Sequence, residues 1–301
     1  MVSWPTPGTR VTVRYRRPAG SIPPLTDAVG HLLDIEPLVR VQTKTGAVVQ
    51  FAPADVVAVR TLSDAPVRTS QIRALEHAAA FAWPGVEQQW LDGWLLRAGY
   101  GVTSRANSAV PLEVSASTAT IPAIVDWYTR RGLTPRLAIA DRLLRLPGMA
   151  EQANAVLVRD VRTAEPDPSV RLSDRPDDTW LQLYRREVPV DVLTAVVDGE
   201  LVFGMHTDLA VARASVTDAP DGTRWVGLSA MRVADQAAGR ALSKALLAWG
   251  AAHGATRGYV RILEDDHAAA DLAQSLGFAL HHRARYFTAG TVGSGHARRH
   301  D

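Results

Sequence analysis

The residues with the clearest potential for chemistry lie in a short turn, Gln236–Ala241, which joins an apolar segment to a helical pattern. At a helix N-terminus several backbone N–H groups lack intrahelical partners and the helix dipole is positive, so such a turn can bind a phosphate. Gly239 would let the main chain approach that ligand closely, and Ala241 would leave room against a sheet. Nothing in the local sequence requires glycine at position 239 for packing. The turn therefore predicts an anion site.

The elements that must position this turn follow from the apolar pattern. Residues 228–233 read as a strand, and one face of the next helix carries Leu242, Ala245, Leu246 and Trp249. A second strand is predicted at Tyr259–Leu263. A second helix then ends in Leu276-Gly277-Phe278.

This order of elements resembles the GCN5-related N-acetyltransferase (GNAT) family. The family signature Gln/Arg-x-x-Gly-x-Gly/Ala is met by Gln236, Gly239 and Ala241, and a downstream pattern is partly met by Asp266, Ala269, Leu272, Ala273, Gly277 and Phe278. The resemblance implies that acetyl-CoA is the co-substrate, with its pantetheine arm between diverging strands. The residues implied to bind it are Met231, Arg232, Val233, Gln236, Ala237, Ala238, Gly239, Arg240, Ala241, Asp266 and Ala269.

Two departures from the family pattern bear on this site. Asp266 stands where the family usually has Asn, and a carboxylate there also suits a helix N-cap. Ala273 stands where many members have the tyrosine that protonates the departing thiolate. Either Tyr286 supplies that proton or none is needed.

The base that accepts the amine proton is less well defined by the sequence. Glu264 is our candidate, with Asp265 beside it and Glu113 as a weaker alternative; a carboxylate at a strand end can equally be a solvated surface group. A working base needs a raised pKa and hence partial burial.

Composition limits the class of protein. The chain has 301 residues, 47% of them hydrophobic and 21% charged, with a net charge of +2 and no cysteine. These values predict a soluble globular protein without disulfides or thiolate metal sites. No long apolar run or signal-peptide pattern occurs, so we expect a cytoplasmic protein with no membrane partner. The nine histidines, including His281-His282, lack metal-ligand spacing, so no metal is predicted.

The predicted fold class is α+β with a mixed sheet, divided into three parts. Residues 1–62 read as a small SH3-like β-barrel, 63–162 as a degenerate GNAT-like lobe and 163–301 as the catalytic GNAT domain with a disordered tail. The barrel strands are predicted at Arg10–Arg16, Val29–Ile35, Leu38–Lys44, Ala47–Phe51 and Val56–Thr61, and a linker at 63–69.

The degenerate lobe lacks the glycine turn, so it is expected to form a wall of the acceptor pocket rather than to bind CoA. Its predicted elements are helices at Gln71–Ala82 and Ile121–Arg131 and strands at Gln89–Ala98, Gly101–Leu112 and Pro135–Ala140. Arg105, Asn107 and Ser108 either face outward or contact the substrate. In the last part we predict helices at Asp177–Glu187 and Val190–Asp198, strands at Leu201–His206, Leu209–Thr217 and Arg224–Val233, and a closing pair at Phe278–Arg283 and Ala284–Ala289.

The predicted function is acetyl transfer from acetyl-CoA to a primary amine by direct attack in a ternary complex. The acceptor is either a small amine such as an amino acid or a protein lysine. The alternative is a non-catalytic acyl-CoA sensor or scaffold that docks a partner through the barrel, a possibility motivated by Ala273. Nucleic-acid binding is unlikely, because it would depend on Arg14, Arg16 and Arg17 alone; the sequence does not specify an oligomeric state.

Overall fold

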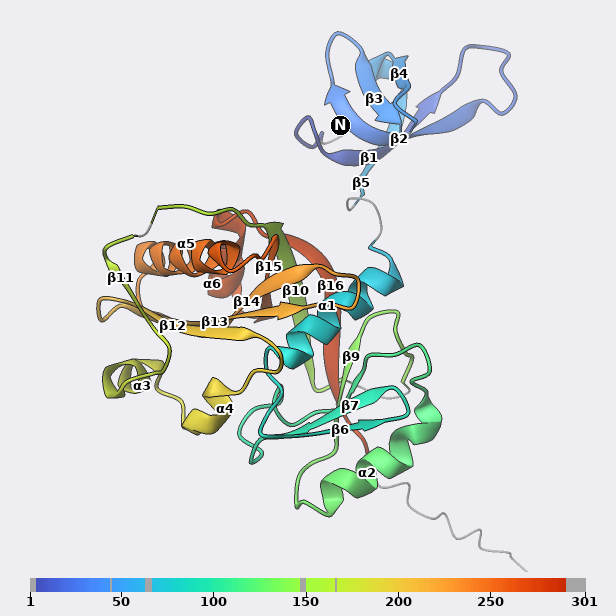
Figure 1. Ribbon diagram of the computed structural model, residues 1–301. Helices are drawn as coiled ribbons and strands as arrows, with labels where there is room; N and C mark the ends of the chain where they lie inside the picture. Colours follow the sequence, from blue (N-terminus) through green and yellow to red (C-terminus); the bar gives the residue numbers. More distant parts are fainter. Residues whose placement is uncertain (1–3, 44, 63–66, 147–149, 166, 291–301) are drawn as a thin grey trace, which may run out of the picture. The chain divides into compact units, whose positions relative to one another are not determined.

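The computed structural model describes residues 4–43, 45–62, 67–146, 150–165 and 167–290 (Figure 1). The chain folds into two compact units, Met1–Pro66 and Val67–Asp301, and each is considered by itself. The predicted linker lies partly, and the predicted tail from residue 291 wholly, outside the described residues. Among the described helices, none has the length and apolar character needed to cross a bilayer.

The first unit is a five-stranded antiparallel sheet in the order β4-β3-β2-β1-β5. Its strands are β1 (Arg10–Arg16), β2 (Leu25–Asp34), β3 (Val39–Thr43), β4 (Val48–Phe51) and β5 (Val56–Thr61). Alternate side chains of these strands point to one face, as the period of a strand requires, and they form a common core with Phe51. The strand prediction for this part of the chain is confirmed.

The second unit is built on an eight-stranded mixed sheet in the order β11-β12-β13-β14-β15-β10-β16-β9 (Figure 1). The strands are β9 (Arg136–Ala140), β10 (Gln152–Asp160), β11 (Val170–Ser173), β12 (Glu200–His206), β13 (Ala210–Asp218), β14 (Arg224–Val233), β15 (Arg257–Leu263) and β16 (Ala279–Thr288). The helices are α1 (Thr69–Phe81), α2 (Ile121–Thr129), α3 (Asp178–Tyr184), α4 (Val190–Thr194), α5 (Gln236–Ala252) and α6 (His267–Ser275). The helices α5 and α6 lie on one side of this sheet, and α3 and α4 lie on the other (Figure 1).

The strand predictions for this unit differ from the structure at several places. The sequence did not predict β10, which pairs with both β15 and β16 in the middle of the sheet. It also missed the edge strand β11. The closing pair of strands is a single strand, β16, because β16 pairs along its length with β10 on one side and β9 on the other. The boundary between residues 162 and 163 stays a prediction.

A small sheet of β6 (Glu87–Leu91), β7 (Trp94–Ala98) and β8 (Val110–Pro111) packs with α2. The predicted strand Gln89–Ala98 is instead a hairpin, because Asp92 and Gly93 both adopt positive φ and turn the chain. The predicted strand Gly101–Leu112 is mostly a loop. Its backbone groups bond to the Asn107 side chain rather than to a neighbouring strand.

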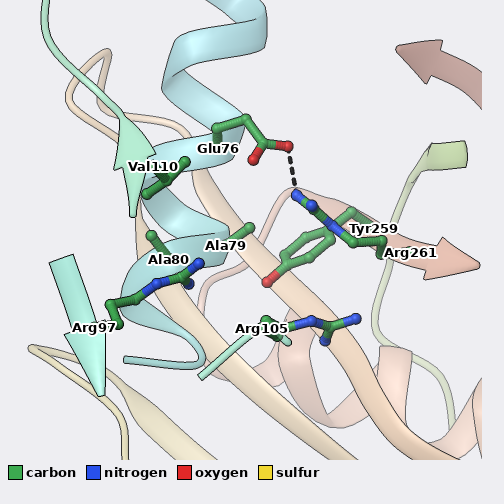
Figure 2. Close-up of a pocket in the computed structure, with 8 residues that line it drawn as sticks. All are labelled: Glu76, Ala79, Ala80, Arg97, Arg105, Val110, Tyr259 and Arg261. Carbon is green, nitrogen blue, oxygen red and sulfur yellow. Dashed lines mark hydrogen bonds and ion pairs between the residues drawn. The ribbon is translucent and has the colours of Figure 1, made fainter. Parts of the chain in front are cut away.

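A buried ionic network joins α1 to the sheet. The carboxylate of Glu76 accepts hydrogen bonds from Arg261 of β15 at 2.5 Å and from Nε2 of His282 of β16 at 2.8 Å, and Figure 2 shows the Arg261 contact. Burial alone would raise the pKa of Glu76, but the charge of Arg261 and the bond from His282 outweigh it and hold that pKa well below its usual range. Glu76 is therefore a buried anion that fixes α1 against two strands.

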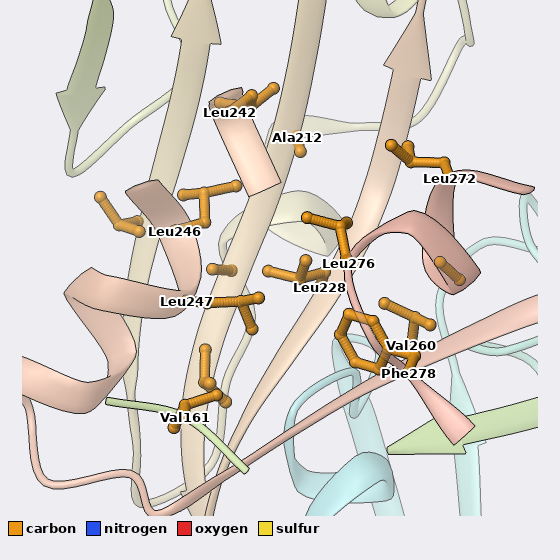
Figure 3. Packing of buried hydrophobic residues seen from close by; sticks show 14 of the residues in the cluster. Val161, Ala212, Leu228, Leu242, Leu246, Leu247, Val260, Leu272, Leu276 and Phe278 are labelled. Carbon is orange, nitrogen blue, oxygen red and sulfur yellow. The ribbon is translucent and has the colours of Figure 1, made fainter. Parts of the chain in front are cut away.

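The helices α5 and α6 cover their side of the sheet with a shared apolar core (Figure 3). Leucines 242, 246, 247, 272 and 276 of these helices meet Leu228, Val260 and Phe278. A Cβ placed on Gly239 would lie 2.7 Å from Cγ1 of Val233 and 3.3 Å from Cδ2 of Leu272. Gly239 thus lets the start of α5 approach β14 and α6 closely. The expectation that no packing requirement explains this glycine is wrong.

The ionic network predicts that Glu76→Gln lowers the free energy of unfolding by about 3–5 kcal/mol at pH 7, because Arg261 then becomes an uncompensated buried charge. The matched control is Glu87→Gln, which removes an exposed carboxylate paired with Arg131 and should cost less than about 1 kcal/mol. Urea denaturation measures both. Since the folded-state pKa of Glu76 is lowered, its stabilisation is complete above the ordinary pKa of 4.5 and decreases as the pH falls below that value. Equal losses in the two variants would contradict a special role for the buried carboxylate.

The packing of Gly239 makes a second prediction about stability. An alanine normally stabilises a helix interior by about 1 kcal/mol relative to glycine, whereas overpacking a core costs about 1–3 kcal/mol. Gly239→Ala should therefore fail to stabilise the protein and should lower its unfolding free energy by up to about 2 kcal/mol in urea denaturation. Ala237→Gly, at an exposed position of the same helix, is the control for helix propensity, with an expected cost of about 1 kcal/mol at most. A Gly239→Ala variant more stable than the parent protein would show that the core accommodates the methyl group.

Candidate active site

The candidate site begins where two neighbouring strands part in the middle of the sheet. The strands β14 and β15 pair in parallel from Trp225 opposite Arg257 to Leu228 opposite Val260, and the described ladder ends there. From Ser229 onward, β14 has no strand partner on the β15 side within the described sheet. The predicted divergence of these two strands is present in the structure.

A bulge in β14 lies directly beyond this point. The pairing of β14 with β13 shifts between Val211 and Arg213, so that Ala230 and Met231 together oppose one residue of β13. Ala230 has a φ of 46°, which an L-residue adopts rarely. Strained backbone of this kind is concentrated at functional sites, and a bulge redirects the backbone groups of its strand.

A cavity of about 800 Å³ opens at the parting strands. Its volume is that of a site for a sizeable small molecule. The lining comes from β14, β15, the start of α5, α6, β10, β16 and three further segments of the chain, which contribute Trp83, residues 102–105 and residues 184–188. Among the predicted site residues, those that line it are Met231, Val233, Gln236, Asp266, Ala269 and Tyr286.

The remaining predicted residues lie near the cavity or apart from it. Ala238 and Gly239 are buried inside α5, and the lining does not include Arg232, Ala237, Arg240 or Ala241. Glu264 lies at the surface, where its Oε1 accepts a bond from Nε of Arg283 at 2.6 Å. The structure therefore does not place Glu264 beside Tyr286 in the cavity.

The start of α5 is already capped by a carboxylate that the sequence analysis did not consider. The N–H of Ala238 donates to Oδ1 of Asp235 at 2.9 Å, and the N–H of Gly239 donates to the Asp235 carbonyl. Beyond Gly239 the helical pattern occupies the N–H groups, so Gln236 and Ala237 remain the amides of the first turn that can face an anion. The negative charge of Asp235 opposes a phosphate at the same place.

Two buried polar side chains of the lining lack partners among the described residues. They are Nδ2 of Asn154 on β10 and Oγ of Ser243 on α5. A buried donor without a partner costs free energy, and ligand polar groups can satisfy it. Together with the unpaired edge of β14, these atoms suit a ligand that carries several amides and hydroxyls, as the pantetheine arm does.

One wall of the cavity is a loop of the predicted degenerate lobe, Val102–Arg105. The side chain of Asn107 shapes this loop: Oδ1 accepts from the N–H groups of Gly99 and Gly101 at 2.8 Å, and Nδ2 donates to the Thr103 carbonyl at 2.7 Å. Two closely spaced glycines, Gly99 and Gly101, followed by several polar residues were the available signal for this loop. Asn107 thus supports the wall from behind, whereas Arg105 lines the cavity itself.

Further lining residues were not predicted from the sequence. Trp83 follows α1, and Tyr184, Arg186, Glu187 and Val188 lie at or after the end of α3. They come from separate parts of the chain, so no local motif marks them.

In the first unit, Arg14 is paired with Asp27 through two hydrogen bonds of 2.9 Å, which leaves less free positive charge there for a nucleic acid.

Comparisons with known proteins agree with this architecture. A family model described as "Probable histone acetyltransferase Rv0428c C-terminal" matches residues 69–287, and one described as "Rv0428c N-terminal Sm-like domain" matches residues 5–60. The probable histone acetyltransferase Rv0428c of Mycobacterium tuberculosis is 65% identical over 300 residues, covering 97% of this chain and 99% of that protein. The uncharacterized N-acetyltransferase YobR of Bacillus subtilis is 24% identical, covering 69% of this chain and 94% of that protein.

A solved GCN5-related N-acetyltransferase from Kribbella flavida is 14% identical, with a TM-score of 0.49, covering 75% of this chain and 97% of that chain. The first unit is Sm-like according to its family model, which corrects the SH3-like assignment within the class of small five-stranded β-domains. The second unit matches its family model over almost its whole described length. The chain belongs to the GNAT family of acetyltransferases.

Proposed function

We propose that this acetyltransferase moves the acetyl group of acetyl-CoA to a primary amine by direct attack within a ternary complex. The observation that carries the proposal is the parting of β14 and β15 onto a cavity of about 800 Å³ that reaches the start of α5. The name of the mycobacterial relative at 65% identity supports acetyl transfer to an amine. The acceptor is a small amine or a lysine side chain.

Acetyl-CoA fits this cavity through the backbone. Its pantetheine amides complement the edge of β14 from Ser229 to Val233 that faces β15, where backbone groups lack a strand partner. The N–H groups of Gln236 and Ala237 face the diphosphate, with Asp266 and Ala269 beside them in the lining. The start of α5 therefore keeps its predicted role in anion binding, but with only two backbone amides, those of Gln236 and Ala237.

The residues around the parting strands can assist the transfer in two ways. A backbone N–H at Met231 or Arg232, redirected by the bulge, stabilises the negative charge that develops on the acetyl oxygen. Holding the two substrates in one cavity supplies further rate enhancement, up to about 7–11 kcal/mol in ideal cases.

The lining also contains groups that can transfer protons. Glu187 contributes a carboxylate, while the carboxylate of Asp266 already accepts the N–H of Ala269 at 2.9 Å. Glu187 is exposed, as Glu264 is, but it lines the cavity, so we assign the base to Glu187 rather than to Glu264. Tyr286, buried in the lining, remains the candidate proton donor to the thiolate.

The test combines binding with turnover. Calorimetry should detect acetyl-CoA binding to the full chain, and a thiol-release assay should show turnover with a panel of amines, with the acetylated product identified by mass spectrometry. Binding without turnover on any amine would support the alternative, an acyl-CoA sensor. If acetyl-CoA did not bind to the protein even at high concentration, the proposed function would be contradicted.

The capping carboxylate of Asp235 predicts an effect on affinity. Asp235→Asn keeps an acceptor for the Ala238 N–H but removes a negative charge beside the proposed diphosphate. A charge at a helix terminus contributes about 0.3–1 kcal/mol, so the affinity for acetyl-CoA should rise about two- to fivefold in calorimetry at low salt. Asp178→Asn, in the first turn of α3 and outside the cavity lining, should leave it unchanged. A weaker affinity in Asp235→Asn would place the diphosphate elsewhere.

The two candidate bases can be separated by matched variants. Glu187→Gln should lower kcat by about 100-fold or more, the usual contribution of a general base, and should abolish the acidic limb of the pH–rate profile. Glu264→Gln removes the same charge from the surface pair with Arg283 and should change kcat less than about twofold. Steady-state kinetics with the best amine measures both. The reverse ranking would restore Glu264 as the base.

A further inference from the structure

The interior of the second unit holds several arginines, and their partners differ. Arg261 is neutralised by Glu76. Arg213 is fully buried and donates to the carbonyls of Leu193 and Ala195 at 2.7 Å. These two guanidinium groups are therefore satisfied within the protein.

Arg97 is likewise occupied. It donates to the carbonyl and the hydroxyl of Ser108 at 3.2 and 2.9 Å, and to the Trp83 carbonyl at 3.2 Å. Burial lowers the pKa of Arg97, yet the group keeps its charge at neutral pH because the ordinary pKa of arginine is far higher. Like Arg213, it brings positive charge into the interior without a carboxylate partner.

Arg105 differs from these residues. Its guanidinium lies 5.7 Å from the Trp83 ring, and within the described part of the chain it takes part in no hydrogen bond or ion pair. It lines the large cavity and also the small polar pocket beside Arg261, and its side chain extends away from Arg97 (Figure 2). Arg105 thus presents unused donors to the space where the acceptor must enter.

The acceptor end of the cavity is the part lined by residues 102–105 and 184–188. The other charged residues there do not neutralise Arg105. Arg186 and Glu187 both line it and oppose each other in charge, and Arg261 is matched by Glu76. Asp266 lies at the other end, where it caps α6. The acceptor end therefore carries a net positive charge.

We propose that Arg105 binds an anionic group of the acceptor, so that the substrate is a small amine that also carries a carboxylate or a phosphate. This inference rests on the proposed function and specifies its substrate class. A guanidinium fork binds either anion with two parallel hydrogen bonds, and both ligand chemistries suit the site. Tyr184 and Trp83 add aromatic walls for the carbon skeleton. A lysine on a basic protein tail fits poorly, because its neighbouring cations would meet Arg105 and Arg186.

The experiment compares acceptors that differ only in the anionic group. Thiol release is measured at saturating acetyl-CoA with L-amino acids against their amides, with O-phosphoethanolamine against ethanolamine, and with Nα-acetyl-lysine amide. We expect kcat/KM to be at least about tenfold higher for the anionic member of one pair, and the pair that responds identifies the anion as carboxylate or phosphate.

Arg105→Gln should reduce this preference about ten- to a hundredfold, mainly by raising KM for the anionic acceptor, while the uncharged partner is turned over as before. Arg105→Lys should recover part of the preference, because the charge remains while the fork is lost. Arg130→Gln, at the exposed residue that follows α2, is the control, with parental kinetics expected. Acetyl-CoA affinity and thermal unfolding of Arg105→Gln, measured in parallel, show that the variant is folded.

The outcomes separate this inference from the proposed function. The anion site would be overturned if uncharged amines or the lysine amide were acetylated as well as or better than the anionic acceptors and if Arg105→Gln did not change these rates. The proposal of acetyl transfer would then still stand. Lack of thiol release with every amine would overturn both.

Discussion

The site depends on one constraint, which is that two strands in the middle of a sheet stop pairing before they end. Each backbone N–H and C=O group that leaves a ladder needs another partner, and an orphaned group costs about as much as a lost hydrogen bond. Here β14 parts from β15 beyond Leu228, and the bulge residues Ala230 and Met231 line the cavity that opens there. The cores on both sides of the sheet maintain this arrangement, since α5 and α6 pack on one side and α1 is fixed by Glu76 on the other.

Local sequence patterns predicted the elements whose residues pack locally. Periodic leucines defined α5, and β14, α5, β15 and α6 were all predicted in the right order. The predicted turn Gln236–Ala241 already forms the first residues of α5, which begins at Gln236. Prediction failed where pairing is non-local. Strand β10 lies between β15 and β16, although both of these strands are far from it in sequence: β10 ends at Asp160 and β15 begins only at Arg257. No local feature of the residues of β10 encodes these neighbours. The stretch Gly101–Leu112 was predicted as a strand, but the side chain of Asn107 bonds to the backbone and produces a loop.

The glycine of the family signature shows why a motif can identify a site without explaining each of its residues. Gly239 is buried, and a side chain there would collide with Val233 and approach Leu272. The same residue therefore serves the contact between α5 and the strand that carries the bulge. Gly239 does not line the cavity, and it sets how closely the first turn of α5 approaches β14. A sequence pattern cannot distinguish this role from direct contact, since both require the smallest residue at the same position.

The acceptor end of the cavity differs from the signature in how it is assembled. Its wall combines the loop at residues 102–105, the segment after α3 and the strands of the second half of the chain. Three buried arginines occupy this region, and the structure pairs one of them, Arg261, with a buried carboxylate while Arg97 and Arg213 use neutral oxygens. Neutral partners satisfy the donors without cancelling the charge, so a positive potential persists inside the unit. The proposed acceptor site therefore depends on how distant segments bring cations together, and the signature of α5 carries no information about it.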